Sequence, residues 1–320
     1  MRSPSVTQIP PQPLRSTPPS GEDARPALRT EGLTRDYGGS GLFEVSIVVP
    51  EGSVYGLVGP NGAGKTTLLS IVTGVRHADR GHVELGVDRR RIAVCPDVPE
   101  FDGWLTAFEV VDLARSYVAP EQDGDSVLRA LRSAGLADAV DRRVGGFSRG
   151  MTQRLGLAAA LVGDPRLLIL DEPSSALDPA GRADVLALVA GLRGRCTVIF
   201  SSHILADVQR VADQVGVLRA GRLLHQGPTQ ALVDTYLQPR WRLRVGGGAG
   251  PVAAALEREP WVATVSRHGD ELDVDATGLE AGERGIPRVI SATGARLVAC
   301  EPIAADLESA FLALTGGSVR

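Results

Sequence analysis

The segment GPNGAGKT, residues 59–66, limits the folds open to this chain more than any other part of the sequence. It fits the pattern G-x-x-x-x-G-K-[S/T], whose glycines let successive backbone N–H groups turn inward around an anion. The apolar run SVYGLVG precedes it, and the helical pattern KTTLLSIVTGV follows it. A strand, a glycine-rich turn and a helix N-terminus in this order predict a phosphate-binding loop in an α/β sheet.

Lys65 is the only lysine in the chain, although Lys and Arg together number 34. A compact ammonium fits inside a closed ring of backbone N–H groups, whereas a planar guanidinium is wider. We predict that Lys65 bridges the β- and γ-phosphates of a nucleotide and that Thr66 offers a hydroxyl to Mg²⁺. The residues predicted to surround the nucleotide phosphates are Gly59, Pro60, Asn61, Gly62, Ala63, Gly64, Lys65, Thr66 and Thr67.

A second segment, RLLILDEP at residues 166–173, is an apolar strand that ends in two acids. The carboxyl ends of strands are where ligands bind in α/β sheets. We therefore expect Asp171 to hold Mg²⁺, usually through water, and Glu172 to polarise an attacking water as a general base. Taken alone, the pattern also suits a strand followed by an acidic helix cap.

Composition and apolar patterning divide the chain into segments of different kinds. Residues 1–26 are rich in proline and polar residues, which is typical of a disordered tail. Apolar strand and helix patterns alternate over 27–237, which predicts an α/β domain, and helical spacing alone over about 101–163 predicts a helical insert. Residues 238–320 follow the order strand, helix, strand, strand, helix, strand, which predicts a small α+β accessory domain of ferredoxin-like type.

Composition excludes several classes of protein. With 43% hydrophobic residues, 22% charged residues and a net charge of −4, the chain has no broad basic field, so we expect no nucleic-acid partner. Its three cysteines are far apart and favour neither a disulfide framework nor a zinc site. No apolar run approaches the roughly 18 residues of a membrane span. We expect a cytoplasmic protein whose membrane role, if any, comes through a partner.

From about residue 28 to 237 the chain resembles the nucleotide-binding subunits of ABC transporters. FSRGMTQR, from Phe147 to Arg154, stands at the place of the family signature LSGGQ and keeps Ser148 and Gly150 but not the residues beside them. SALD, ending at Asp178, resembles the D-loop, and SSH, ending at His203, resembles the switch-histidine loop. Tyr37 stands where the family places an aromatic side chain that stacks on adenine.

The resemblance implies an ATPase in which two subunits, identical or different, pair head to tail around ATP and Mg²⁺. Ser148 and Gly150 would face the γ-phosphate of ATP held by the second ATPase subunit. Asp178, in the D-loop, would belong to the nucleotide site and would also cap the helix that follows it. His203, with Lys65 and Glu172, would act on the γ-phosphate within its own subunit. ATP binding would close the dimer, and hydrolysis would let it open.

Asp97 departs from the family, which usually has Gln at this place after the strand RIAVC. A carboxylate keeps an oxygen for Mg²⁺ but loses a hydrogen-bond donor and adds negative charge. We therefore expect Asp97 to join Thr66 and Asp171 at the metal and to alter the Mg²⁺ dependence. The alternative is a solvent-facing turn residue.

The ending EPIAADLESAFLALTG resembles the C-terminal extension of ATPases from bacterial drug- and antibiotic-resistance exporters. This implies export driven through an integral-membrane permease on a separate chain, with the ATPase peripheral on the inner face of the membrane. The permease is expected to dock beside the helical insert near residues 101–104. Two other readings stay open: a soluble ABC ATPase outside transport, and a regulatory module that binds ATP without appreciable hydrolysis.

Overall fold

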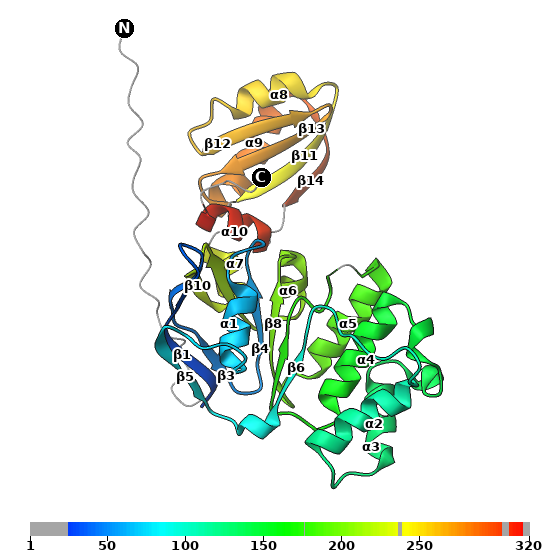
Figure 1. Ribbon diagram of the computed structural model, residues 1–320. Helices are drawn as coiled ribbons and strands as arrows, with labels where there is room; N and C mark the ends of the chain where they lie inside the picture. The colour runs from blue at the N-terminus through cyan, green and yellow to red at the C-terminus, as the bar shows by residue number, and fades with distance from the viewer. Residues whose placement is uncertain (1–24, 176, 236–238, 303–306, 316–320) are drawn as a thin grey trace. The chain divides into compact units, whose positions relative to one another are not determined.

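The computed structural model describes residues 25–175, 177–235, 239–302 and 307–315 (Figure 1). These residues form two compact units. The larger unit runs from the first described residue to His203 and includes Val211–Pro228; the smaller unit comprises Ile204–Arg210 and the described residues from Thr229 onward. The expected tail, apart from its last two residues, and the expected boundary at 237–238 lie outside the described residues.

A six-stranded sheet is the centre of the larger unit. Its strands follow the order β10-β9-β4-β8-β7-β6; all pairs are parallel except β9 with β10. The strands are β4 (Val54–Val58), β6 (Ile92–Cys95), β7 (Leu167–Leu170), β8 (Thr197–Ser202), β9 (Gln214–Arg219) and β10 (Arg222–Pro228). Every residue of β4, β7 and β8 is buried, which explains why these strands read as continuous apolar runs rather than alternating patterns.

A second, antiparallel sheet in the larger unit is built around β1, which pairs with three other strands. Its members are β1 (Pro26–Asp36), β2 (Gly41–Val45), β3 (Val48–Pro50) and β5 (Arg80–Leu85). Buried side chains of this sheet share one core with α1 (Lys65–Val72) and with strands of the six-stranded sheet. The short helix η1 (Arg89–Arg91) leads into β6.

Three helices follow β6 and precede β7 along the chain (Figure 1). Their buried side chains form a separate hydrophobic core. They are α2 (Ala107–Val118), α3 (Gly124–Ser133) and α4 (Arg149–Leu161), with the short turns η2 (Ala137–Ala139) and η3 (Val144–Gly146) between α3 and α4. A capping box starts α2, because Thr106 and Glu109 each accept a hydrogen bond from the backbone N–H of the other. This helical insert returns to the sheet at β7, and α5 (Pro179–Gly191) then precedes β8.

The smaller unit contains a four-stranded antiparallel sheet in the order β12-β13-β11-β14. Most of α6 (Leu205–Val211) belongs to this unit, and α7 and α10 pack together within it. Its other elements are α7 (Thr229–Thr235), β11 (Arg240–Gly246), α8 (Ala249–Leu256), β12 (Val262–His268), β13 (Glu271–Ala276), α9 (Leu279–Thr293), β14 (Arg296–Pro302) and α10 (Leu307–Thr315).

Close helix–sheet packing in the smaller unit depends on a glycine. A Cβ added at Gly282 on α9 would lie 2.1 Å from the indole of Trp241 on β11, so only glycine lets the helix approach this closely. Trp241 is buried in a core formed by α8, α9 and the sheet. Among the helices described, none is both long and apolar enough to cross a membrane.

Candidate nucleotide site

Three parallel strands, β4, β8 and β7, are neighbours in the central sheet and end at the same edge. The predicted phosphate loop follows β4, the acids Asp171 and Glu172 follow β7, and His203 follows β8. Segments that are far apart in the sequence therefore meet at this edge, where ligands bind in α/β sheets.

The loop between β4 and α1 has the glycine-dependent backbone that its sequence predicts. Gly62 and Gly64 have φ angles of +79° and +103°, a region that strains other residues. A Cβ at Gly59 would lie 2.2 Å from the carbonyl oxygen of Leu218. Gly64 is the N-cap of α1 and provides no side-chain hydrogen bond, so the first N–H groups of the helix are available to an anion.

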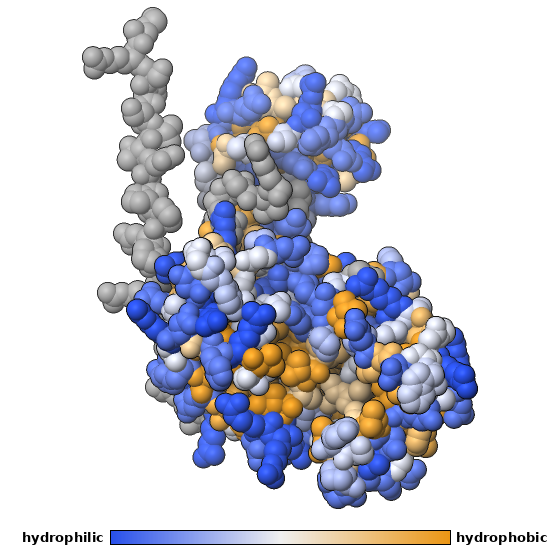
Figure 2. All heavy atoms as spheres, viewed as in Figure 1, coloured by the Kyte–Doolittle hydropathy of each residue, from blue (hydrophilic) through white to orange (hydrophobic). Residues whose placement is uncertain are grey.

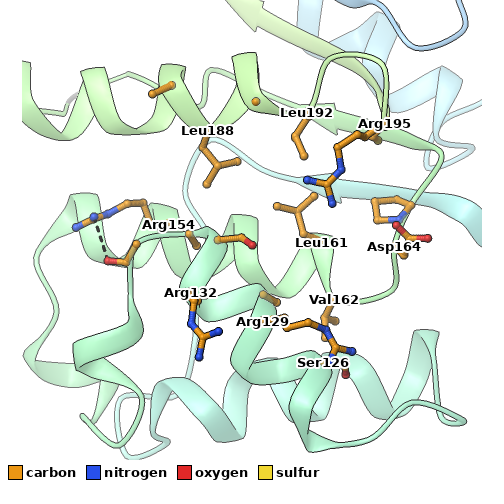
Figure 3. Close-up of a pocket in the computed structure, with 18 of the residues that line it drawn as sticks. Ser126, Arg129, Arg132, Arg154, Leu161, Val162, Asp164, Leu188, Leu192 and Arg195 are labelled. Atoms are coloured by element: carbon orange, nitrogen blue, oxygen red, sulfur yellow. Dashed lines mark hydrogen bonds between the residues drawn. The ribbon is translucent and has the colours of Figure 1, made fainter.

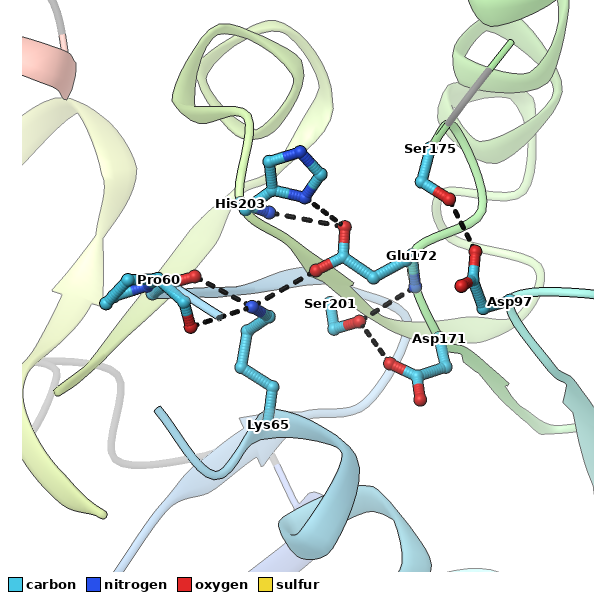
Figure 4. Close-up of polar contacts among 9 residues, drawn as sticks. Pro60, Lys65, Asp97, Asp171, Glu172, Ser175, Ser201 and His203 are labelled. Atoms are coloured by element: carbon cyan, nitrogen blue, oxygen red, sulfur yellow. Dashed lines mark hydrogen bonds and ion pairs between the residues drawn. The ribbon is translucent and has the colours of Figure 1, made fainter. Parts of the chain in front are cut away.

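Lys65 lies at the centre of this loop and is only 6% exposed. Its Nζ donates hydrogen bonds to the carbonyl oxygens of Gly59 (2.7 Å) and Pro60 (3.3 Å), and it forms an ion pair of 3.1 Å with Glu172 Oε1 (Figure 4). The backbone thus aims the ammonium at the mouth of the loop. Of the other predicted loop residues, Ala63 is buried, Gly64 and Thr67 are half-buried, and Pro60, Asn61, Gly62 and Thr66 are exposed.

Glu172 connects Lys65 of the loop with His203. Its Oε2 lies 2.8 Å from His203 Nδ1 and accepts a hydrogen bond of 3.3 Å from the His203 backbone N–H. Glu172 has a φ of +47°, which is uncommon for a residue with a side chain. One carboxylate therefore bridges a buried ammonium and an imidazole that is 43% exposed.

Ser201, near the end of β8, holds the two acids in place. Its hydroxyl donates a hydrogen bond of 2.6 Å to Asp171 Oδ1 and accepts one of 2.8 Å from the Glu172 backbone N–H. Ser201 is fully buried. Its role was not predicted from the sequence, where the only signal was a pair of serines at the end of an otherwise apolar strand.

Thr66 and Asp171 provide oxygen donors that fit Mg²⁺. The Thr66 side chain is exposed at the start of α1, and Ser201 contacts one Asp171 oxygen only. Mg²⁺ in nucleotide sites is commonly held by one or two protein oxygens together with phosphate and water. Among the described residues, no group of three or more His, Cys, Asp or Glu side chains is arranged to hold a metal ion.

Asp97 lies at the start of the helical insert, beyond β6. Its carboxylate accepts a hydrogen bond from the hydroxyl of Ser175, in the predicted D-loop (Figure 4). The described contact of Asp97 is thus with the D-loop, and the chain is held close to β7 by a hydrogen bond from Asp171 N–H to the carbonyl of Cys95 (3.0 Å).

Tyr37 is exposed at the end of β1 and lies between two arginines. The guanidinium carbons of Arg35 and Arg76 are 5.1 and 5.8 Å from the ring centroid, and Arg76 donates a hydrogen bond of 2.8 Å to the phenol oxygen. The hydrogen bond from Arg76, followed by a second one from Arg35, lowers the pKa of Tyr37. No role for Arg76 was foreseen.

The signature segment forms the start of α4, and Ser148 is its N-cap. The Ser148 hydroxyl accepts a hydrogen bond of 3.3 Å from Met151 N–H, and Ser148 itself is exposed. Met151, which departs from the family pattern, packs against the core of the insert. Gly150 has open space around it, since an added Cβ would lie 4.0 Å from its nearest neighbour, Leu177. The start of α4 is therefore free to face a second molecule.

Asp178 caps α5, and its Oδ1 accepts a hydrogen bond of 3.1 Å from Gly181 N–H. This confirms the capping role that the following helical pattern suggested. Four predicted site residues have no described contact with Lys65, Glu172 or His203. They are Tyr37, Ser148, Gly150 and Asp178.

Comparison with known proteins identifies the family of the chain. The profile described as "ABC transporter" matches residues 42–175. The ABC transporter ATP-binding protein YxlF of Bacillus subtilis, itself uncharacterized, is 37% identical over 74% of this chain and 82% of its own length. The bacitracin transport ATP-binding protein BcrA of Bacillus licheniformis is 35% identical over 63% of this chain and 69% of its own. The Nod factor export ATP-binding protein I of Burkholderia orbicola is 33% identical over 86% of this chain and 92% of its own.

The fold agrees with these relatives. CbiO1 from Clostridium perfringens, part of the ABC transporter complex CbiONQ, superposes with a TM-score of 0.59 and 26% identity over 66% of this chain and 92% of its own. Because the chain has the ABC ATPase fold and is 37% identical to YxlF over most of both chains, it belongs to the family of ABC transporter ATP-binding proteins.

Proposed function

We propose that this protein hydrolyses ATP to drive export through a membrane permease on a separate chain. The observation that carries the proposal is the contact of Glu172 with both Lys65 and His203 at the mouth of the phosphate loop. A cation for the phosphates, a carboxylate base and a histidine for the γ-phosphate are the groups that hydrolysis needs.

The geometry suggests how Glu172 becomes a base. With phosphates in the loop, Lys65 has new anionic partners, and its ion pair with Glu172 is no longer required. The freed carboxylate then accepts a proton from the attacking water, while His203 donates a hydrogen bond to the γ-phosphate. Bound Mg²⁺, held by Thr66 and Asp171, would neutralise charge on the phosphates. Asp97 accepts a hydrogen bond from Ser175 of the D-loop, and its carboxylate would offer a further oxygen to Mg²⁺ beside Thr66 and Asp171.

A second ATPase subunit completes the proposed site. Helix α4 begins at the exposed Ser148 and the half-buried Gly150, and the N-terminus of a helix favours an anion. The described contacts leave these residues apart from the phosphate loop of their own chain, which supports a head-to-tail pair in which each signature meets the ATP of the other subunit. Tyr37 would stack on the adenine.

The permease is proposed to dock on a groove between β6 and the helical insert. The groove has a volume of about 450 Å³ and is lined by apolar residues of both parts, among them Val94, Phe101 and Val118. Figure 2 shows apolar side chains gathered on the larger unit between its strands and the insert. Trp104, in the predicted docking segment, is 67% exposed. An exposed apolar surface of this kind suits a protein partner.

Export, rather than import, is supported by two observations. One relative is a Nod factor export protein, and the chain ends in a pattern that resembles drug exporters. Part of this pattern lies outside the described residues, but its Phe311 is buried on α10. We also propose the ferredoxin-like assignment for residues 238–320, because β11, β12, β13 and β14 alternate with α8 and α9 in the order that this fold requires.

Phosphate release by the wild type and by Glu172→Gln tests the ATPase proposal. Loss of the base should slow release by at least about 10²-fold. Glu121→Gln, at an exposed position of the helical insert, is the matched control and should keep the wild-type rate. Equal rates in wild type and Glu172→Gln would refute the role of Glu172.

Co-purification tests the partner. Tagged protein extracted in mild detergent from native membranes should bring a polytopic membrane protein in stoichiometric amount. Recovery without a membrane protein would contradict the transport proposal and favour an ABC ATPase outside transport.

A further inference from the structure

A second groove of the larger unit lies away from the nucleotide site and has no part in the function proposed above. It has a volume of about 960 Å³ and lies between the insert helices α3 and α4 on one side and α5 with the start of β8 on the other (Figure 3). Asp164 and Pro165, just before β7, and Arg195 and Cys196, just before β8, line it. The groove is therefore at the amino ends of these strands, whereas the nucleotide residues follow their carboxyl ends.

Four arginines and two aspartates line this groove. Among the described residues, Arg129, Arg132 and Arg195 have no side-chain hydrogen bond or ion pair. Arg154 makes only long contacts, 3.4 Å to the Gly135 carbonyl and 3.5 Å to Asp184, and its buried Nε has no partner. Guanidinium groups that line a groove and have no partner of their own provide donors for an anion.

The acids do not cancel this charge. Asp164 forms an ion pair of 2.9 Å with Arg91, and Asp184 faces Arg154. The three remaining arginines give the groove an excess of positive charge. Figure 3 shows the Arg195 side chain extending toward Leu161 and Leu192, with Arg129 beside Val162 on the opposite wall.

The floor between these arginines is apolar. Leu161, Leu188 and Leu192 come from α4, from α5 and from the residue after it, and all three are half-buried. Small ligand sites typically combine such an apolar lining with a few charged groups that fix orientation. We propose that this groove binds a small, soluble amphipathic anion with a doubly charged head, such as a phosphate monoester, and a short apolar body.

Calorimetric titration of the full-length protein with octyl phosphate tests this site directly. A saturating non-hydrolysable ATP analogue is present, so that the phosphate loop is blocked. We expect saturable binding of one equivalent in the wild type. The double variant R129Q/R195Q should bind at least about tenfold more weakly, because each charge-assisted hydrogen bond contributes about that factor. Both arginines are exposed and unpaired, so the variant should melt at the wild-type temperature.

Two single variants and two further ligands sharpen the test. R258Q, which removes an exposed arginine in the smaller unit, should leave the affinity unchanged. D184N should raise the affinity, because it frees Arg154 and removes a negative charge. Inorganic phosphate should bind more weakly than octyl phosphate. Vesicles containing phosphatidic acid should sediment the wild type no more than they sediment R129Q/R195Q.

Other results would overturn the proposal. Equal affinity in the wild type and R129Q/R195Q, or no binding of octyl phosphate while the ATP analogue fills the phosphate loop, would place the anion elsewhere. Inorganic phosphate as tight as octyl phosphate would exclude a role for the apolar floor. Vesicle binding lost in R129Q/R195Q would assign the groove to a lipid headgroup instead. None of these readouts depends on ATP hydrolysis, so the proposed function can fail or hold independently.

Discussion

Replacing Glu172 by Gln should tighten ATP binding as well as slow hydrolysis. In the structure Lys65 and Glu172 form an ion pair of 3.1 Å, with side chains 6% and 14% exposed. At an effective dielectric constant of about 20, the Coulomb attraction at this distance is about 5 kcal/mol. Desolvation opposes it, and the net value of a charged hydrogen bond is about 1.5–3 kcal/mol.

In the proposed site the phosphates of ATP bind the same ammonium, so ATP must compete with that ion pair. Gln keeps the size of the side chain but removes its charge. Most of the net free energy of the ion pair is then no longer lost when Lys65 binds ATP. The expected gain is about 10- to 100-fold in affinity, at 1.4 kcal/mol for each factor of ten. Equilibrium binding of a fluorescent ATP analogue without Mg²⁺, where hydrolysis does not interfere, measures it.

Glu121→Gln is the matched control, since it removes an exposed carboxylate of the helical insert and leaves the ion pair between Lys65 and Glu172 intact. It should bind ATP with nearly the wild-type affinity. If Glu172→Gln binds ATP no more tightly than the wild type, the ion pair between Lys65 and Glu172 does not weaken nucleotide binding, which contradicts the prediction.

Three more predictions concern residues around the site and in the sheet. Ser201→Ala removes a fully buried hydroxyl with two hydrogen bonds and should destabilise the protein by about 1–3 kcal/mol, whereas Ser46→Ala, at an exposed hydroxyl that also accepts a backbone N–H, should change the melting temperature little. Arg76→Gln should raise the lowered pKa of Tyr37 toward its ordinary value of 10.0, seen as the tyrosinate absorbance that Tyr37→Phe lacks; an unchanged titration would exclude Arg76 as the main cause. Burial lowers the pKa of His225, so the unfolded chain binds a proton more readily; stability is complete above the ordinary value of 6.5 and falls as the pH drops below it, and His225→Gln should reduce that loss in thermal melts.

Much of this fold follows from local patterns. Continuous apolar runs predicted β4, β7 and β8, because strands covered on both faces need no alternation. Helical spacing predicted the helices between β6 and β7, and the glycine pattern predicted the loop before α1. These features depend on residues near one another in the sequence.

Tertiary contacts were harder to foresee. That Ser201 bridges Asp171 and Glu172 depends on β7 and β8 being neighbours, which no local pattern states. The same holds for the grouping of Ile204–Arg210 with the smaller unit, where Gln209 Oε1 accepts a hydrogen bond of 2.7 Å from Leu307 N–H. Asp97 was expected near the metal because of its place in a family pattern, and its contact with Ser175 became visible only in three dimensions.

The helical insert leaves the sheet at β6 and returns at β7, and these two strands are adjacent, with Ile92 paired to Leu167 and Cys95 to Leu170. Everything between them is one crossover connection. The sheet therefore meets the insert at two covalent joints only, one beside Asp171 and one at the opposite edge. The insert can therefore be lengthened, shortened or reshaped without changing a single hydrogen bond between the strands of the sheet.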